Sequence, residues 1–181
     1  MGLNHVDMDA CKAKGVQVFN APGMNANAVA ELTFSKMLDL SRHTIPANYD
    51  VKVNKNWDKY KFVGRELRGK TLGILGFGRI GQHLGVMAKA IGMKVIAFDI
   101  YQVPVISEQL GIPYVEMDEL LAQSDFISVH APAVDGGALI SAENIAKMKD
   151  AWWSSTPPAA PTWTRPPAGR SGVRQGPGRR S

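Results

Sequence analysis

Apolar residues in the middle of the chain form short continuous runs separated by stretches of helical spacing. The runs 71–75 and 94–98 are almost unbroken, which is typical of strands buried on both faces of a parallel sheet. A shorter run at 126–129 is also mainly apolar. Between the first two runs, apolar spacing closed by Gly92 predicts a helix over 79–91. Strands and helices that alternate with short connections predict an α/β fold with a doubly wound parallel sheet.

The same cycle continues with shorter elements. We expect helices at 107–110, 117–123 and 142–149, and one more strand at 113–115. The segment 151–181 holds six prolines, four glycines and five arginines, and it has no Leu, Ile, Phe or Tyr. Such a composition cannot bury a strand, so we expect this tail to be disordered and the sheet to be incomplete.

The N-terminal third follows a different pattern. A helical stretch over 8–14 ends at Gly15, and the run 17–20 predicts a strand closed by the turn Pro22-Gly23. Asn25 or Asn27 can then cap a helix that continues to about Arg42. Its apolar face is expected to contain Val29, Leu32, Met37 and Leu40.

Residues 43–67 are polar and basic, and we interpret them as an extended linker over the surface. Trp57, Tyr60 and Phe62 could pack this linker onto a neighbouring part of the protein.

Charge and composition limit the possible partners. The net charge is +5, but the five arginines of 151–181 leave 16 basic and 16 acidic side chains in residues 1–150. A neutral body argues against nucleic acid as a partner. No run approaches the roughly 18 apolar residues of a membrane span, and the N-terminus has no export or lipidation pattern. A single cysteine, Cys11, forms no internal disulfide, so we expect a cytoplasmic protein.

The motif that carries chemistry is Gly76-Phe77-Gly78-Arg79-Ile80-Gly81, placed between a strand and a helix. Gly76 permits the tight turn, Gly78 lets a pyrophosphate approach the backbone, and Gly81 lets the helix pack closely on the strand. Amide groups of the first helical turn would then face the phosphates. The context predicts a Rossmann-like dinucleotide site, although a glycine-rich turn in an unrelated α/β protein is the alternative.

Asp99 ends the next strand, 23 residues after Gly76. A carboxylate at this place can accept hydrogen bonds from the adenosine ribose and would repel a 2'-phosphate, which favours NAD over NADP. An aspartate in a surface turn is the alternative. His130 also ends a strand, at 126–130, and we favour a histidine satisfied by backbone groups over a catalytic one. His43 and His83 are interpreted as surface or packing residues, and no metal-ligand spacing is present.

Several motifs together resemble one family. They are Gly69 to Gly81, the turn Asn20-Ala21-Pro22-Gly23, the helix start Val29-Ala30-Glu31, and the strand end His130-Ala131-Pro132. In this order they are similar to the NAD-dependent D-2-hydroxyacid dehydrogenases, in particular to 3-phosphoglycerate dehydrogenase and hydroxypyruvate reductase-like members. The resemblance covers about residues 1–150.

The resemblance implies a domain organisation. Residues 1–24 correspond to a remnant of the substrate domain, 25–67 to a crossing helix and linker, 68–150 to a partial NAD-binding unit, and 151–181 to the basic tail. In the family, long helices pack into a homodimer, but the missing segments argue against carrying this state over to the present chain.

The resemblance also implies site residues. Those matching cofactor contacts are Gly76, Gly78, Arg79, Ile80, Gly81, Asp99, Ala131 and Pro132. Gly23, Met24 and Asn25 match the turn that faces the substrate carboxylate. The family's acid/base histidine, its orienting glutamate and its carboxylate-binding arginine all lie beyond the point that matches residue 150. We therefore expect no catalytic residue and no turnover in this chain, which is truncated at both ends relative to the family.

The sequence of the tail suggests why the family residues expected after residue 150 are missing. Tryptophan has one codon, and the bases that encode residues 152–160, read one base earlier, permit Val-Val-Ile-Asn-Thr-Ala-Arg-Gly. That sequence resembles the family strand and arginine expected next. We hypothesise a frameshift near Asp150, and the alternative is a natural basic disordered tail.

The function expected is therefore the NAD-binding portion of an oxidoreductase that transfers a hydride between nicotinamide and a 2-hydroxy or 2-oxo acid. The alternative is a non-catalytic, NAD-sensing binding protein that acts like a corepressor.

Overall fold

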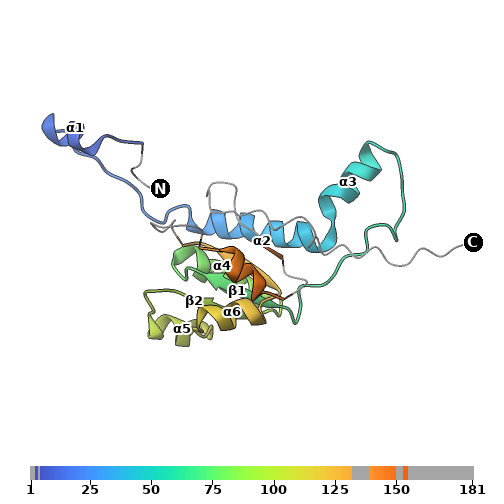
Figure 1. Ribbon diagram of the computed structural model, residues 1–181. Helices are drawn as coiled ribbons and strands as arrows, with labels where there is room; N and C mark the ends of the chain where they lie inside the picture. Colours follow the sequence, from blue (N-terminus) through green and yellow to red (C-terminus); the bar gives the residue numbers. More distant parts are fainter. Residues whose placement is uncertain (1–2, 4, 132–138, 150–152, 155–181) are drawn as a thin grey trace, which may run out of the picture.

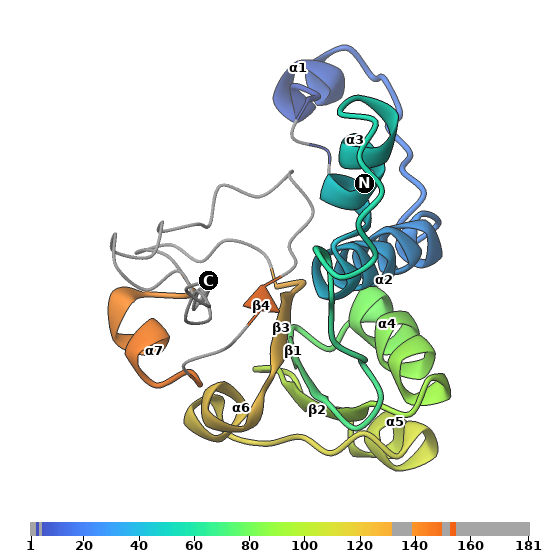
Figure 2. The same cartoon turned by 90° about the vertical axis from the view of Figure 1, so that its right-hand side faces the viewer.

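The computed structural model describes residue 3 and residues 5–131, 139–149 and 153–154. Within them, four parallel strands form one sheet in the order β2-β1-β3-β4 (Figures 1 and 2). The strands are β1 (Thr71–Leu75), β2 (Lys94–Phe98), β3 (Phe126–Val129) and β4 (Trp153–Ser154). The chain moves from β1 to β2 on one side and returns to the other side of β1 with β3, so the carboxyl end of β1 is a topological switch point.

Helices cover both faces of the sheet, as expected for a doubly wound fold. They are α4 (Arg79–Ala90), α5 (Pro104–Leu110), α6 (Met117–Gln123) and α7 (Ala142–Ala146). Figure 2 shows α4 on one side of the sheet and α6 and α7 on the other. Because successive side chains of a strand point to opposite faces, Leu72 and Ile74 join the core under α4, while Leu75 joins the core under α6. This confirms the predicted fold class.

Three helices precede the sheet: α1 (Met8–Ala13), α2 (Ala26–Arg42) and α3 (Thr44–Lys52). The long helix α2 lies against α4 (Figure 1), and α1, which buries none of its residues, projects beyond one end of α2. Residues 26–42 thus form the outer layer above the face of the sheet that α4 covers.

The buried face of α2 differs from the prediction. Of the four apolar residues expected there, Met37 is buried, but Leu32 and Leu40 are 46% and 36% exposed. The buried stripe consists mainly of small side chains: Ala26, Ala30, Thr33, Met37 and Ser41. The hydroxyls of Thr33 and Ser41 donate to carbonyl oxygens of their own helix, at 2.8 and 2.7 Å, so they pack without an unsatisfied polar group. Small residues let α2 and α4 approach closely.

The predicted strand at 17–20 is wrong. Residues 15–21 have no regular structure, and Phe19 is 85% exposed. A short apolar run forms a strand only where a neighbouring strand supplies hydrogen bonds, and none pairs with this segment among the described residues.

The linker expected at 43–67 is also corrected, because residues 44–52 form the helix α3. His43, in the left-handed conformation with φ of 55°, separates α2 from α3. Pro46 is tolerated because it stands in the first turn of α3, where backbone N–H groups have no partner within the helix. We call residues 44–63 the arm.

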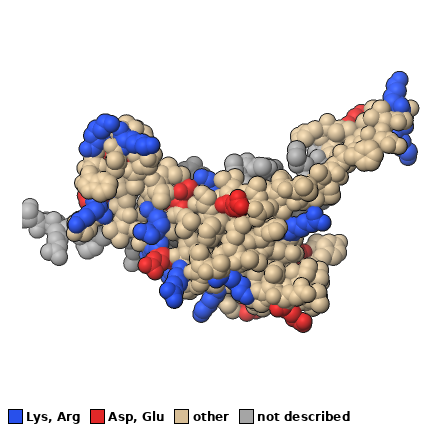
Figure 3. Space-filling model, turned by 180° about the vertical axis from the view of Figure 1, so that it is seen from behind, with Lys and Arg blue, Asp and Glu red and all other residues tan. Residues whose placement is uncertain are grey.

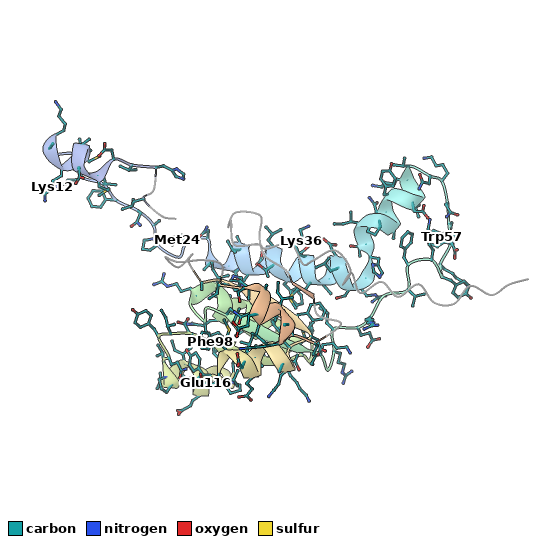
Figure 4. All side chains as sticks on the ribbon, in the orientation of Figure 1. Lys12, Met24, Lys36, Trp57, Phe98 and Glu116 are labelled. Carbon is teal, nitrogen blue, oxygen red and sulfur yellow. The ribbon has the colours of Figure 1, made fainter. Side chains whose placement is uncertain are left out.

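A buried carboxylate organises the arm. The side chain of Asp50 is only 6% exposed, and it accepts hydrogen bonds from the side chains of Asn54, Asn56 and Lys61 at 2.8–2.9 Å. The hydrogen bond from Asn54, and then that from Lys61, lowers the pKa of Asp50 below its ordinary value. Trp57 and Tyr60 do not pack as predicted: they are 82% and 73% exposed, and Figure 4 shows Trp57 on the arm, away from the sheet.

Smaller differences concern the ends of elements. The predicted strand at 113–115 reduces to a single bridge between Tyr114 and Ala97, and α5 begins earlier than expected, with Pro104 as its first residue. The expectation that the tail supplies no strand is wrong at one point, since β4 pairs with Phe126–Ile127. The rest of the tail, residues 155–181, lies outside the described residues. No helix within the described part of the chain is both long and apolar enough to cross a bilayer.

Candidate functional site

The glycine loop lies at the switch point and is crowded by backbone on one side. Gly76 has φ of +90°, and a methyl group at its Cα would stand 2.5 Å from the nitrogen of Ala131 and 2.7 Å from the carbonyl carbon of His130. A Cβ on Gly81 would stand 2.6 Å from the Gly76 oxygen. Neither position can hold a side chain without moving the backbone, so these two glycines fix the loop against β3 and under α4.

Gly78 has the opposite surroundings. A Cβ placed there would meet no atom within 4 Å, so the space beside the loop is open. Gly78 is the N-cap of α4, whose start has no side-chain cap and no acidic residue in its first turn. The backbone N–H groups and the positive end of the helix dipole therefore face this open space. Such a cradle fits the pyrophosphate of a dinucleotide.

Asp99 is tied to the same loop. Its Oδ2 accepts a hydrogen bond from the Phe77 nitrogen at 2.6 Å, and its Oδ1 accepts one from the Tyr101 nitrogen at 2.9 Å. A carboxylate offers about four lone-pair sites, so two acceptor positions remain for ribose hydroxyls. The carboxylate thus has a second role that the sequence did not reveal: it holds the glycine loop against the end of β2.

A cavity of about 230 Å³ lies between the loop and the start of α2. It is lined by Gly23, Asn25, Ala26, Gly78, Arg79, Ile80 and His130. The structure therefore brings Gly23 and Asn25 to the glycine loop. Met24, placed with them by the resemblance, is 82% exposed and does not line the cavity; Figure 4 shows it where the chain enters α2.

His130 closes the cavity from the end of β3. Its backbone nitrogen donates to the Leu75 oxygen at 2.7 Å, and its Nε2 lies 2.8 Å from Oγ of the buried Ser128. Burial lowers the pKa of His130 to about 4. The imidazole is therefore neutral near pH 7, which makes it a weak proton donor. The backbone of His130 continues the pairing with β1, but its ring hydrogen bond is with a side-chain hydroxyl and not with the backbone groups that we expected.

The remaining sequence candidates lie apart from this cavity. His83 is exposed on α4, and His43 ends α2. Ala131 follows His130 and its backbone abuts Gly76, whereas Pro132 lies outside the described residues. No group of three or more His, Cys, Asp or Glu side chains in the described ranges could hold a metal ion.

Comparison with known proteins identifies the domain. Residues 34–153 match the family model described as the NAD binding domain of D-isomer specific 2-hydroxyacid dehydrogenases. The chain belongs to this family. The match covers the glycine loop, Asp99 and the strands β1, β2 and β3, and it confirms NAD as the cofactor of the fold.

Individual 2-hydroxyacid dehydrogenases agree with this assignment. The chain is 45% identical over 152 residues to hydroxypyruvate reductase of Thermotoga maritima, covering 83% of this chain and 48% of that protein. It is 40% identical over 150 residues to D-3-phosphoglycerate dehydrogenase of Synechocystis sp., covering 82% of this chain and 27% of that protein. The chain therefore spans half or less of the curated relatives that it matches.

Solved structures of the family have the same fold. A pyruvate reductase of Chlamydomonas reinhardtii superposes with a TM-score of 0.78 at 38% identity, over 86% of this chain and 46% of that one. D-lactate dehydrogenase from Aquifex aeolicus, complexed with NAD and lactic acid, gives a TM-score of 0.72 at 35% identity, over the same shares of the two chains.

Two contacts of this dehydrogenase domain were missed from the sequence. One is the hydrogen bond between the Phe77 nitrogen and Asp99, and the other joins the side chain of Arg79 to the Pro22 oxygen at 3.0 Å. Both connect residues far apart in the chain through a backbone group, so no side-chain pattern signals them.

Proposed function

We propose that this chain binds NAD across the glycine loop Gly76–Gly81 and Asp99, as the cofactor half of a 2-hydroxyacid dehydrogenase. The observation that carries the proposal is the open, uncapped helix start at Gly78 beside a carboxylate with acceptor positions to spare. When bound, NAD supplies a nicotinamide ring that exchanges a hydride with a 2-hydroxy or 2-oxo acid.

Each residue has a distinct part in this proposal. Backbone amides at Gly78, Arg79 and Ile80 bind the pyrophosphate, and Asp99 binds the ribose hydroxyls. The close approach of Ala131 to Gly76 brings the end of β3 to the cofactor, and the adjacent Pro132 contacts it by family resemblance. Gly23, Met24 and Asn25 form the turn proposed to face the substrate carboxylate.

Titration of the full chain with NADH and NADPH, followed by nucleotide fluorescence, tests the site. We expect saturable binding of NADH and at least about tenfold weaker binding of NADPH, because Asp99 repels the 2'-phosphate. Asp99→Asn should narrow that preference and weaken NADH binding, since one amide of the loop loses its charged acceptor. Equal binding of both nucleotides by the wild-type chain would contradict the role of Asp99.

We further propose that the chain alone does not turn over substrate. Of the residues that line the cavity, His130 is the one with an ordinary acid/base side chain, and its pKa of about 4 and its contact with Ser128 disfavour proton donation at neutral pH. Oxidation of NADH with hydroxypyruvate, pyruvate or glyoxylate by the purified chain would disprove this proposal.

Binding without turnover is also what an NAD-sensing binding protein needs. Affinity capture from the source cells, with and without NAD, distinguishes the two functions. Retention of a partner only in the presence of NAD would favour the corepressor-like alternative.

We also propose that residues 1–24 are a substrate-domain remnant, that 25–67 hold the crossing helix and a connection that includes α3, and that 68–150 are the NAD unit. For 151–181 we propose a frameshift near Asp150. The pairing of Trp153–Ser154 with β3 supports it, because the sheet accepts a strand where the shifted frame would encode Val-Val-Ile-Asn. Resequencing the gene tests the proposal, and an unchanged frame would refute it.

The missing segments argue against the family's homodimer for this chain; if two copies do assemble, we propose the arm as the surface through which they meet. The arm exposes a set of apolar and aromatic side chains: Ile45, Tyr49, Val51, Val53, Trp57, Tyr60 and Val63. Lys and Arg side chains gather at the tip of the arm, and acidic side chains lie nearer the middle of the same view (Figure 3). Light scattering of the purified chain measures the assembly, and a monomer at high concentration would contradict a contact through the arm.

A further inference from the structure

Arg79 is the point at which the glycine loop touches the turn before α2. Its Nη1 donates a hydrogen bond to the Pro22 oxygen at 3.0 Å, across 57 positions of the chain. Its side chain also covers the next residue, since a methyl group on Gly23 would stand 2.4 Å from Nη1 and 2.7 Å from Cδ of Arg79. The guanidinium therefore lies directly on the turn.

Gly23 is required here for two reasons. Its φ of +78° belongs to the left-handed region, and its missing side chain leaves the room that Arg79 occupies. Gly69 has nearly the same backbone, with φ of +77°, but a Cβ placed on it would meet nothing within 4 Å. An alanine at either position strains the backbone, but only an alanine at Gly23 also disturbs the contact with Arg79. Comparing the two substitutions therefore separates these two effects.

The guanidinium has donors left over. It carries five N–H groups, and among the described residues one of its hydrogen bonds is seen, to Pro22. No carboxylate of the described chain forms an ion pair with it. Because Arg79 is the first residue of α4, a pyrophosphate at the helix start would lie within reach of these donors. A planar fork can hold two acceptors at once, whereas the ammonium of a lysine offers no such fixed geometry.

We propose that Arg79 is a positioning residue that couples the phosphate site to the turn Pro22–Asn25. The proposal rests on the NAD site proposed above. One N–H group of the guanidinium keeps its hydrogen bond to the Pro22 oxygen, and the remaining N–H groups donate to the pyrophosphate. Phosphate binding then orders the guanidinium, which orders the turn. By linkage, a turn held in place also raises the affinity for the dinucleotide by the same factor.

The coupling matters because the turn lines the other side of the same cavity. Gly23 and Asn25 line it together with Gly78 and His130. A bound dinucleotide would thus fix the segment that leads from α1 into α2, and with it the wall of the cavity opposite the cofactor. The phosphate would act at a distance on residues that it does not contact.

Hydrogen exchange on the full chain tests this, with ADP-ribose as the probe. In the wild-type chain we expect ADP-ribose to slow exchange in the loop 76–82 and, by about tenfold, at the amides of 23–26, where the Ala26 nitrogen bonds to the Gly23 oxygen. Arg79→Lys should bind ADP-ribose more weakly, and at a saturating concentration of ADP-ribose its loop should still be protected but its turn should not. Gly23→Ala should behave like Arg79→Lys, and the matched control Gly69→Ala should behave like the wild type.

The outcomes separate the coupling from the site itself. Protection of 76–82 without protection of 23–26 in the wild-type chain overturns the coupling and leaves the NAD site standing. Equal protection of 23–26 in the wild type and in Arg79→Lys also overturns it. Absence of protection in both segments refutes the NAD site and the coupling together. A double variant with Gly23→Ala and Arg79→Lys should add nothing to either single change, and additive effects would count against a shared mechanism.

Discussion

The glycine loop and the arm are held in place by different kinds of contact. At the loop, backbone meets backbone: the nitrogen of Ala131 would lie 2.5 Å from a methyl group on Gly76, and a Cβ on Gly81 would crowd the Gly76 oxygen. In the arm, one buried carboxylate, Asp50, gathers three side-chain donors, and much of the apolar surface remains exposed. The loop is therefore held mainly by backbone crowding, together with the hydrogen bond from Phe77 to Asp99, whereas the arm is held mainly by the hydrogen bonds of one carboxylate. The arm should therefore open in strong acid, whereas the pH dependence at the loop should come from His130.

The largest effect should come from filling the crowded loop. Gly76→Ala forces a side chain into the left-handed region and against the backbone of β3, so we expect a loss of about 3–4 kcal/mol in the free energy of unfolding. NADH binding should be lost with it. Gly69→Ala, which has a similar φ but open space, should cost only about 1 kcal/mol. Urea denaturation of both variants measures these free energies of unfolding. Equal losses would mean that backbone strain accounts for the whole effect and that crowding against β3 adds nothing.

The second effect concerns His130, whose imidazole lines the cavity beside the loop. The pKa of His130 is about 4 in the folded chain and near 6.5 when unfolded, so the unfolded state binds the proton first as the pH falls. Stability is fully present above pH 6.5 and should decline by roughly 3 kcal/mol between there and pH 4. His130→Gln should flatten this decline in denaturation curves taken at several pH values. A decline that persists unchanged in the variant would assign it to other groups.

The third effect should be confined to the arm and to stronger acid. The folded pKa of Asp50 lies below its ordinary value of 3.8, mainly through the hydrogen bond from Asn54, so its contribution is present above that value and lost as the pH falls further. Hydrogen exchange should show residues 50–61 opening below about pH 4 while the strands stay protected. Asp50→Asn should leave the arm loose already at neutral pH, with NADH binding unchanged. If the arm stays protected in this variant, Asp50 is not what holds the arm together.

The smallest effect on stability should come from the surface of the arm. Trp57 is 82% exposed, so Trp57→Ala should change the free energy of unfolding of the monomer by less than about 0.5 kcal/mol. If the arm forms the homodimer, the same change should raise the dissociation constant at least about tenfold, as expected for a buried aromatic anchor. Phe19→Ala, at 85% exposure outside the arm, is the matched control and should not affect assembly. Sedimentation of both variants measures the dissociation constant and tests whether the arm forms the homodimer contact.

The sequence predicted those parts of the fold that are defined by a local pattern of residues. The bounds of β1, β2, β3 and α6 match the predictions because each of these elements is defined by its own run of apolar residues. The glycine loop was predictable as well, since conformations open only to glycine leave a trace in the sequence.

Contacts between distant segments leave no such trace. The helix α3 escaped prediction because Asp50 contacts Asn54, Asn56 and Lys61, polar residues that in the sequence look like a solvated linker. The run 17–20 looked like a strand but has no partner strand within the described chain. The bond from Arg79 to Pro22 was hidden because its acceptor is a backbone oxygen.

The close packing of α2 on α4 has a consequence for modularity. The signature motif begins at Gly76, yet Ala30 and Met37 of α2 share one apolar cluster with Leu84 and Ala88 of α4. A segment cut just ahead of β1 and grafted into another protein would leave that cluster open to water. The smallest portable unit therefore begins before Ala26, and recombination between relatives within residues 26–70 would divide a core cluster that the two helices share.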